Sequence, residues 1–246
     1  MLEKVAVVWY ILYMGKRFFL TRLFLGFILF AFFALPLSAQ NFLNKISWLI
    51  DGTVLFFPED NGVDSDPMPV LPSFGFGASY TVIKDSIVDL SLELTFDFYM
   101  THYGYSDKLE RAVPTAIENR TARVLGFIFG FNVSGSYQFN SFIRTRLYAG
   151  PAADLRAVFR AAGLNAGLDN LTEIDKEVDS TRNYFWSSGR WFLPVAGTGV
   201  DFKINDTFKL GIDFRVWMPM YKLWSGEDLP AIEGWRFGAG VRLTIR

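Results

Sequence analysis

Apolar and polar residues alternate along most of the chain, and this pattern limits the possible fold more than any other feature. In residues 87–100, every second side chain is apolar, and the positions between them include Asp89 and Asp97. The same alternation returns at 208–220 and at 235–246. A period of two places successive side chains on opposite faces of a β-strand. These segments therefore predict strands with one apolar face and one charged face.

The alternating segments and their connections predict an all-β fold, a transmembrane eight-stranded antiparallel up-and-down β-barrel. The strands are expected at about 45–57, 74–83, 87–100, 123–137, 142–156, 191–204, 208–220 and 235–246. Short connections alternate strictly with long ones, which lie at about 58–73, 101–122, 157–190 and 222–233. Membrane barrels have short turns on one side of the membrane and long loops on the other. A strand of about 12 residues at a tilt of roughly 40° covers about 30 Å, enough to cross an outer membrane.

The apolar face is aromatic at both ends. Trp48, Tyr137 and Phe208 lie near the short connections, and Phe56 and Phe98 lie near the long ones. Aromatic residues gather at both membrane–water interfaces of membrane barrels. A soluble barrel is the alternative, but the opposite face carries full charges, and eight strands cannot enclose an aqueous core wide enough to hydrate them.

The first 39 residues predict a signal peptide. Basic residues at 16, 17 and 22 precede an uncharged run that ends at 37, and small residues follow at 38 and 39. A basic region, an apolar region and a small-residue cleavage site define such a leader. Met14 is an alternative start, and a retained anchor is the alternative interpretation. We expect residues 40–246 to form the barrel, in the outer membrane of a two-membrane bacterium, with the long loops extracellular.

Composition removes most catalytic chemistry. The chain has no Cys and a single His, His102, which excludes disulfides, thiolate sites and multi-His metal sites. The net charge of -1 provides no basic field for nucleic acid. We therefore expect no enzymatic activity, no cofactor, no metal and no nucleic-acid partner. An alternative is a lipid-modifying barrel that uses His102, Ser106 and Asp107 in the second long connection.

The charged face of the strands points toward the barrel interior. Inward acids and bases are nearly equal in number, and unpaired charges in so narrow a space are costly, so we expect them to pair. This predicts a salt-bridged plug in the half of the barrel next to the short connections. The predicted plug residues are Asp89, Glu93, Asp97, Arg144, Arg146, Asp201, Asp213, Arg215, Arg236 and Arg242.

Toward the long connections the inward positions become apolar. They are Leu55, Phe57, Tyr99, Ile128, Trp191, Leu193, Val195 and Trp217. Two interpretations are open: ordinary core packing of a narrow barrel, or a chamber that binds a small hydrophobic molecule. Pro151 and Pro194 interrupt two adjacent strands beside this region. Because proline cannot donate to a strand ladder, they predict weakened pairing there, unless they lie at bulges or beyond the membrane.

The last four strands carry a family resemblance. The motifs are Tyr-Ala-Gly-Pro-Ala at 148–152, Gly-Thr-Gly-Val-Asp-Phe-Lys-Ile-Asn at 197–205, the loop segment 163–171 and Trp-Arg-Phe-Gly-Ala-Gly-Val-Arg at 235–242. Over 142–246 the chain resembles the OmpW family of small outer-membrane barrels. The ending Leu-Thr-Ile-Arg departs from the family's usual terminal aromatic residue. The resemblance implies a hydrophobic channel with lateral release to the membrane, and Pro151 and Pro194 then mark a candidate lateral exit.

Two functions follow as expectations. The first is a channel or binding protein for small hydrophobic solutes. The alternative is a surface-exposed structural or adhesion barrel that acts through its long loops. The expected partners are membrane lipids, the outer-membrane assembly machinery and a small hydrophobic solute, and we expect the barrel to be a monomer.

The alternation of long and short connections can be tested with epitope tags. A tag inserted near Asn61 or Asn170, in predicted long loops, should bind antibody on intact cells. A tag at Asn140, in a predicted short turn, should bind antibody only after the envelope is permeabilised. The reverse labelling pattern would overturn the topology.

Overall fold

The computed structural model describes residues 45–58, 70–85, 87–115, 122–160, 171–226, 231 and 233–246. The predicted signal peptide and the positions Asn61 and Asn170 lie outside the described residues. Residues Lys45–Arg246 form one compact unit. Among the described residues, no helix is both long enough and apolar enough to cross a membrane.

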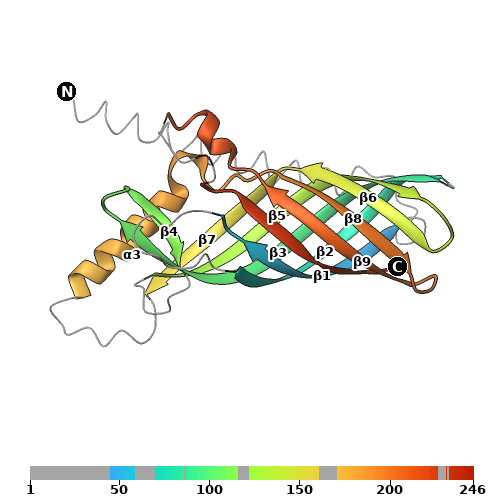
Figure 1. Cartoon of the computed structure of the whole chain (residues 1–246), viewed down its shortest axis with the longest axis horizontal. Coiled ribbons are helices and arrows are strands. Elements are labelled where there is room, and N and C mark those ends of the chain that lie inside the picture. The colour runs from blue at the N-terminus through green and yellow to red at the C-terminus, as the bar shows by residue number, and fades with distance from the viewer. Residues whose placement is uncertain are drawn as a thin grey trace, which may run out of the picture. The chain divides into compact units, whose positions relative to one another are not determined.

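The described chain is a closed antiparallel β-barrel, as the alternation predicts (Figure 1). Its strands are β1 (Ile46–Phe56), β2 (Val70–Lys84), β3 (Val88–Ser106), β5 (Ala122–Gln138), β6 (Ile143–Gly150) with its continuation β7 (Ala152–Arg160), β8 (Val195–Lys203), β9 (Phe208–Trp217) and β10 (Arg236–Ile245). Pairing of β1 with β10 closes the barrel. Because β6 and β7 together make one wall strand, the barrel has the predicted eight strands.

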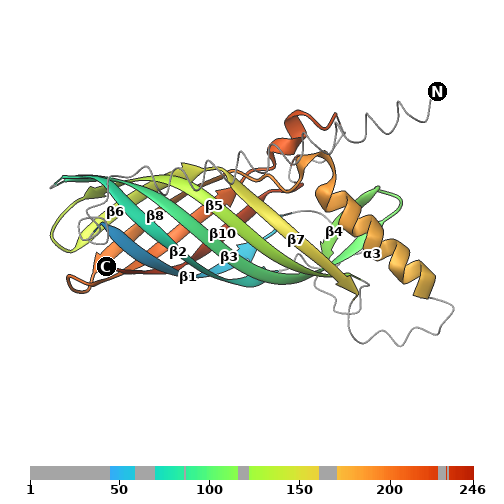
Figure 2. The ribbon, with the colours of Figure 1, turned by 180° about the vertical axis from the view of Figure 1, so that it is seen from behind.

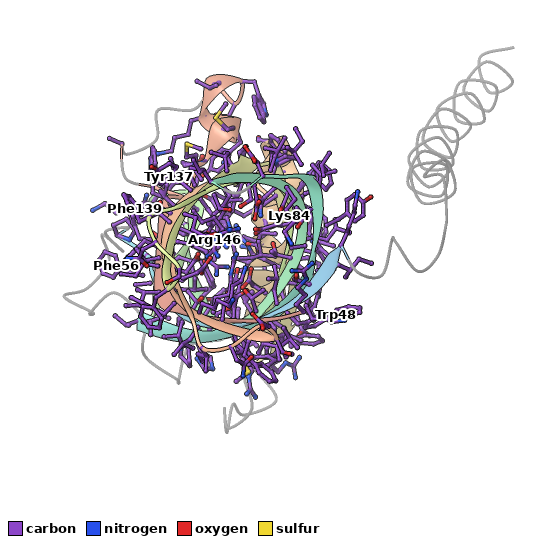
Figure 3. The ribbon with its side chains drawn as sticks, turned by 90° about the vertical axis from the view of Figure 1, so that its right-hand side faces the viewer. Trp48, Phe56, Lys84, Tyr137, Phe139 and Arg146 are labelled. Atoms are coloured by element: carbon purple, nitrogen blue, oxygen red, sulfur yellow. The ribbon has the colours of Figure 1, made fainter. Side chains whose placement is uncertain are left out.

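Alternate residues of each strand face opposite sides of the wall. On β1, Leu55 is 0% exposed, whereas its neighbours Val54 and Phe56 are 50% and 42% exposed. An end-on view shows Trp48 and Phe56 outside the ribbon and Arg146 inside it (Figure 3). An apolar outer wall around a charged interior is the polarity of a membrane barrel, in which pairing between strands satisfies every backbone group of the wall.

Three strands continue beyond the rest of the wall at the end that carries the long loops. Strand β3 runs to Ser106 and pairs there with β4 (Arg111–Thr115), within a segment predicted to be an irregular loop. The predicted strand 142–156 is divided at Pro151, and β7 continues to Arg160 in pairing with β5. Residues 157–160, predicted to begin a long connection, belong to this strand.

A helix covers the inner face of this extension. Helix α3 (Leu171–Trp186) packs against β7, β3 and β4, and its Val178 and Phe185 share an apolar cluster with Tyr103 and Val124. The Phe185 and Tyr103 rings meet edge to face, with centroids 4.8 Å apart. Viewed from behind, α3 lies beside β4 and β7 at this end, opposite the turns (Figure 2). We call α3, β4, β7 and the adjoining ends of β3 and β5 the loop module.

Two inward tyrosines lie directly on glycines of neighbouring strands. A Cβ atom at Gly126 would lie 2.0 Å from Cζ of Tyr99, and one at Gly197 would lie 2.3 Å from Cζ of Tyr148. No carbon atom fits at those distances, so each ring needs a glycine beside it. These contacts hold the two rings flat against the wall, where their hydroxyl groups reach buried carboxylates.

Substitution of Gly126 tests this packing. Gly126→Ala should lower the free energy of unfolding by about 1–3 kcal/mol, because Tyr99 must move out of its place. The matched control is Gly135→Ala on the same strand, where a new Cβ meets nothing within 4 Å. Urea titration of the refolded barrel in lipid vesicles measures both changes. Equal losses for the two variants would contradict the packing argument.

Candidate functional site

Buried arginines join the strands across the lumen near the turns. Arg146 on β6 donates to Asp201 at 2.8 Å and to Asp213 at 2.7 Å. The carboxylate of Asp213 also accepts a hydrogen bond from the Tyr148 hydroxyl at 2.7 Å. Arg146 therefore links β6 to both β8 and β9.

Two further arginines extend the network to the opposite wall. Arg215 on β9 donates to Asp213 at 2.8 Å, to Asp97 at 3.2 Å and to Asp51 at 3.0 Å. Arg242 on β10 donates to the same Asp51 at 2.9 Å and to Glu93 at 3.0 Å. We call the network of these three arginines and five carboxylates the plug. Its members are Asp51, Glu93, Asp97, Arg146, Asp201, Asp213, Arg215 and Arg242.

Small residues make room for the plug. Gly211 lies against Asp201, and an added Cβ there would come within 2.3 Å of Oδ1 of that aspartate. All plug side chains have exposed fractions of 8% or less, so water does not screen their charges. A buried charge without a partner is strongly destabilising, which explains why each arginine has several carboxylates around it.

Two predicted plug residues form a separate pair, and one lies elsewhere. Arg144 and Asp89 bind each other nearer the turns, where both side chains are slightly exposed. Arg236 is not in the plug; it pairs with Asp154 at 2.7 Å. It precedes Arg242 by six residues, about 20 Å along the strand, and so lies at the level of the long loops. Arg236 faces the lumen, as predicted, but it lies toward the long loops and not in the half of the barrel next to the short connections.

Asp154 forms the centre of a second buried ion cluster. Arg156 and Arg236 both bind its carboxylate, and the Tyr99 hydroxyl donates to it at 2.9 Å. The guanidinium carbon of Arg236 also lies 5.1 Å from the centre of the Phe57 ring. Buried charged side chains therefore lie in both halves of the lumen, the half next to the turns and the half next to the long loops.

The predicted solute-chamber residues pack against one another. Seven of the eight have exposed fractions of 4% or less and belong to one apolar cluster, together with Tyr148, Ala152 and Tyr221; the seven are Leu55, Phe57, Tyr99, Ile128, Leu193, Val195 and Trp217. This cluster contacts both ion clusters, because the hydroxyls of Tyr99 and Tyr148 bind Asp154 and Asp213. Between the two open interpretations, such complete burial favours core packing.

The inward orientation predicted for Trp191 is wrong. Its side chain is 40% exposed. The residue follows the short 3₁₀ helix η2 (Ser187–Gly189), and the regular alternation of β8 begins only at Val195. Counting by twos back from the strand therefore does not apply to this position.

The prolines do not open the wall beside the cluster. Pro151 and Pro194 lie opposite each other, and beyond them Leu193 N–H still donates to the Ala152 carbonyl at 3.0 Å. The Pro151 carbonyl accepts from β5, and the Pro194 carbonyl accepts from Met218 after β9. Because the N–H and C=O of one residue in an antiparallel strand point to the same neighbour, the missing donors face β5 and β9. The seam between β7 and β8 therefore keeps hydrogen bonds that the sequence predicted to be weakened.

The loops contain a buried carboxylate that was not predicted from the sequence. Glu233, between β9 and β10, is 1% exposed and binds Arg111 of β4 at 2.9 Å. The Tyr184 hydroxyl of α3 donates to it, and the Tyr221 hydroxyl lies 3.4 Å away. Burial, and then the charge of Glu233, raise the pKa of the Tyr184 phenol, so this hydroxyl stays a donor. This Glu233 cluster joins three long loops, and no periodic pattern marks its residues.

The residues of the enzymatic alternative are not brought together. His102 and Ser106 lie on the same strand four residues apart, about 13 Å along it. The Ser106 hydroxyl instead accepts a hydrogen bond from the Leu109 N–H at 3.3 Å. Across the described ranges, no three His, Asp or Glu side chains are placed to hold a metal ion.

Comparison with known proteins yields only distant matches. No family model matches the chain, and no curated protein matches it in sequence, so the resemblance to the OmpW family stays a prediction. Among solved structures the chain is similar to Neisserial surface protein A (10% identity, 82% of this chain and 96% of that chain, TM-score 0.46). It is also similar to Ail, the attachment invasion locus protein of Yersinia pestis (7% identity, 81% and 95%, TM-score 0.42). A third match is the N-terminal β-barrel domain of Pseudomonas aeruginosa OprF (13% identity, 81% and 97%, TM-score 0.37). At these identities and TM-scores the matches carry no argument about function.

Removal of one arginine tests the plug. Arg146→Ala should lower the free energy of unfolding by about 3–5 kcal/mol, because Asp201 is left buried without its partner. Lys203→Ala is the control: it breaks an exposed ion pair with Asp206, worth at most about 1 kcal/mol. Urea unfolding followed by tryptophan fluorescence measures both. If Arg146→Ala costs no more than the control, the lumen is hydrated at that position and the plug is not a buried network.

Proposed function

We propose that this protein is an outer-membrane β-barrel that acts at the cell surface through its loop module and whose lumen does not conduct solutes. The observation that carries the proposal is the contrast between the two parts of the chain. Charged and apolar side chains fill the lumen, whereas the long loops fold into a module with a core of its own.

The membrane assignment rests on the outer wall and on the leader. The outward side chains of the strands are apolar and include aromatic residues toward both ends, such as Trp48 and Phe98. Residues 1–39 have the composition of a signal peptide. In barrels of the outer membrane of bacteria, short turns face the periplasm and long loops face outward. On this basis the loop module is extracellular.

The absence of conduction follows from the energetics of the plug. A solute that crosses the barrel must separate ion pairs such as Arg242–Asp51 and Arg146–Asp201. Each separation leaves a charge in a place that water does not reach, at a cost of several kcal/mol. The apolar cluster above the plug would have to move aside as well. Passage of a small hydrophobic solute, the first expectation from the sequence, therefore requires a rearrangement of the whole lumen.

The loop module has the properties of a binding surface. Three of its strands continue from the membrane wall, and the Glu233 cluster fixes the loops to one another. Binding residues are commonly placed on loops held by a rigid scaffold. The face of α3 that points away from the sheet carries exposed charges of both signs, among them Asp175, Lys176, Asp179 and Arg182. We infer a polar macromolecular partner, with the protein acting as a monomer and not as an enzyme.

Flux measurements separate a surface module from a channel. Proteoliposomes with the wild-type protein should release neither ions nor a small apolar dye faster than empty liposomes. Glu233→Ala should loosen the module, because the buried Arg111–Glu233 ion pair and the Tyr184 hydrogen bond are lost, and added protease should then cut α3. Flux should nevertheless stay at the background level, because the plug remains intact.

The control for this experiment is Asp175→Ala, which breaks the exposed Arg160–Asp175 pair on the same module. It should leave both protease resistance and flux unchanged. Solute release by the wild-type protein would restore the channel hypothesis. Release that appears only with Glu233→Ala would make the module the lid of a channel, and either result would overturn the proposed function.

A further inference from the structure

Four large apolar side chains are exposed on the two short segments that lead into β8 and out of β9. Trp186, Trp191, Leu223 and Trp224 are 49%, 40%, 74% and 53% exposed. They lie on or beside η2 and a second short 3₁₀ helix, η3 (Met220–Leu223), which connect to the ends of β8 and β9. We call these four side chains the aromatic patch. Contiguous exposed apolar surface is characteristic of sites that contact a protein, a ligand or a membrane.

The base of the patch is fixed. The indole N–H of Trp224 donates to the Ser188 carbonyl at 2.8 Å, so the two 3₁₀ segments are joined. The same ring lies on Gly189, where a φ of 75° strains any residue with a side chain and a Cβ would lie 3.3 Å from the ring, a tight contact. Beneath them, the Arg190 guanidinium lies 4.0 Å from the centre of the Tyr184 ring. The two segments that carry the patch are therefore fixed to each other through Trp224.

The patch continues the apolar outer wall. The Trp191 ring lies next to that of Phe192, 6.1 Å between centroids, and Phe192 is opposite Ala153 in the wall. From Phe208 to Met218 the chain rises about 34 Å along the strand, or about 26 Å of height at a tilt of roughly 40°. The apolar band of a membrane barrel is about 25 Å tall. Helix η3 therefore begins where the chain leaves the hydrocarbon region.

We propose that the aromatic patch inserts into the headgroup region of the leaflet on the loop side and anchors the barrel there on one side. Tryptophan suits this depth because its ring is apolar and its N–H can reach polar headgroups. The anchor is one-sided because the wall of β3 and β5 does not end in such segments. It continues as sheet, with the polar residues His102 and Arg123 paired in register at this end. The occupant is lipid, since the patch is continuous with the lipid-facing wall.

The absence of cysteine makes a direct test possible. In separate variants, Leu223→Cys and Leu109→Cys provide a single thiol for an environment-sensitive fluorophore. Leu109 is the matched control, because it is also an exposed leucine (37%) but lies in the β3–β4 turn of the loop module. Both labelled proteins are refolded into phosphatidylethanolamine–phosphatidylglycerol vesicles at less than one barrel per vesicle.

Nitroxide-labelled lipids and aqueous iodide then report what each probe touches. The probe at position 223 should be quenched several-fold more than the probe at 109 by lipids with a nitroxide near the headgroup, and several-fold less by iodide. Equal iodide quenching at the two positions would overturn the proposal, because the patch would then be in water. Protection from iodide without quenching by nitroxide lipids would also overturn it, because protein and not lipid would cover the patch.

Discussion

The structure depends on the pairing of charges in a lumen too narrow for water to hydrate them. Arg215 shows the arrangement at its most connected, because it reaches Asp213 on its own strand, Asp97 on β3 and Asp51 on β1. One guanidinium with several planar donors can satisfy carboxylates from separate walls at once, which a lysine ammonium does less well. The inward glycines and the flat tyrosines follow from this, since long arginines need space and their carboxylates need further donors. Charged and apolar side chains together fill the lumen.

Much of the barrel could be predicted because, in a strand with a period of two, the position of each residue determines which face of the wall its side chain is on. Once one residue of a strand is known to face inward, its neighbours at even spacing do too, which correctly placed Leu55, Asp97 and Asp213. The alternation does not predict how far along the barrel axis a side chain lies, or which side chain it pairs with. Arg236 has the right parity for the plug, but its partner Asp154 comes from another strand, and only the stagger between strands brings the two together.

Outside the alternating segments, the sequence does not predict which side chains are buried. Trp191 shows this just before β8. Glu233 shows it in a loop, where its burial depends on contacts with Arg111, Tyr184 and Tyr221. The prolines show a third limit. Their missing donors could be counted from the sequence, but the strand that each donor would have faced is a property of the sheet. For the prolines, the sequence therefore located the residues and could not tell which hydrogen bonds they remove.

The continuation of three wall strands into the loop module has a mechanical consequence. Strands β3 and β5 pair without interruption from Val88 and Tyr137, near the turns, to Tyr103 and Ala122, inside the module. A partner that pulls the module away from the membrane therefore pulls along these strands, and their hydrogen bonds, which run across the strands, share the load in shear. A loop attached only by its two ends would instead be peeled away one contact at a time. The β3–β5 ladder thus carries tension from the loop module into the barrel wall.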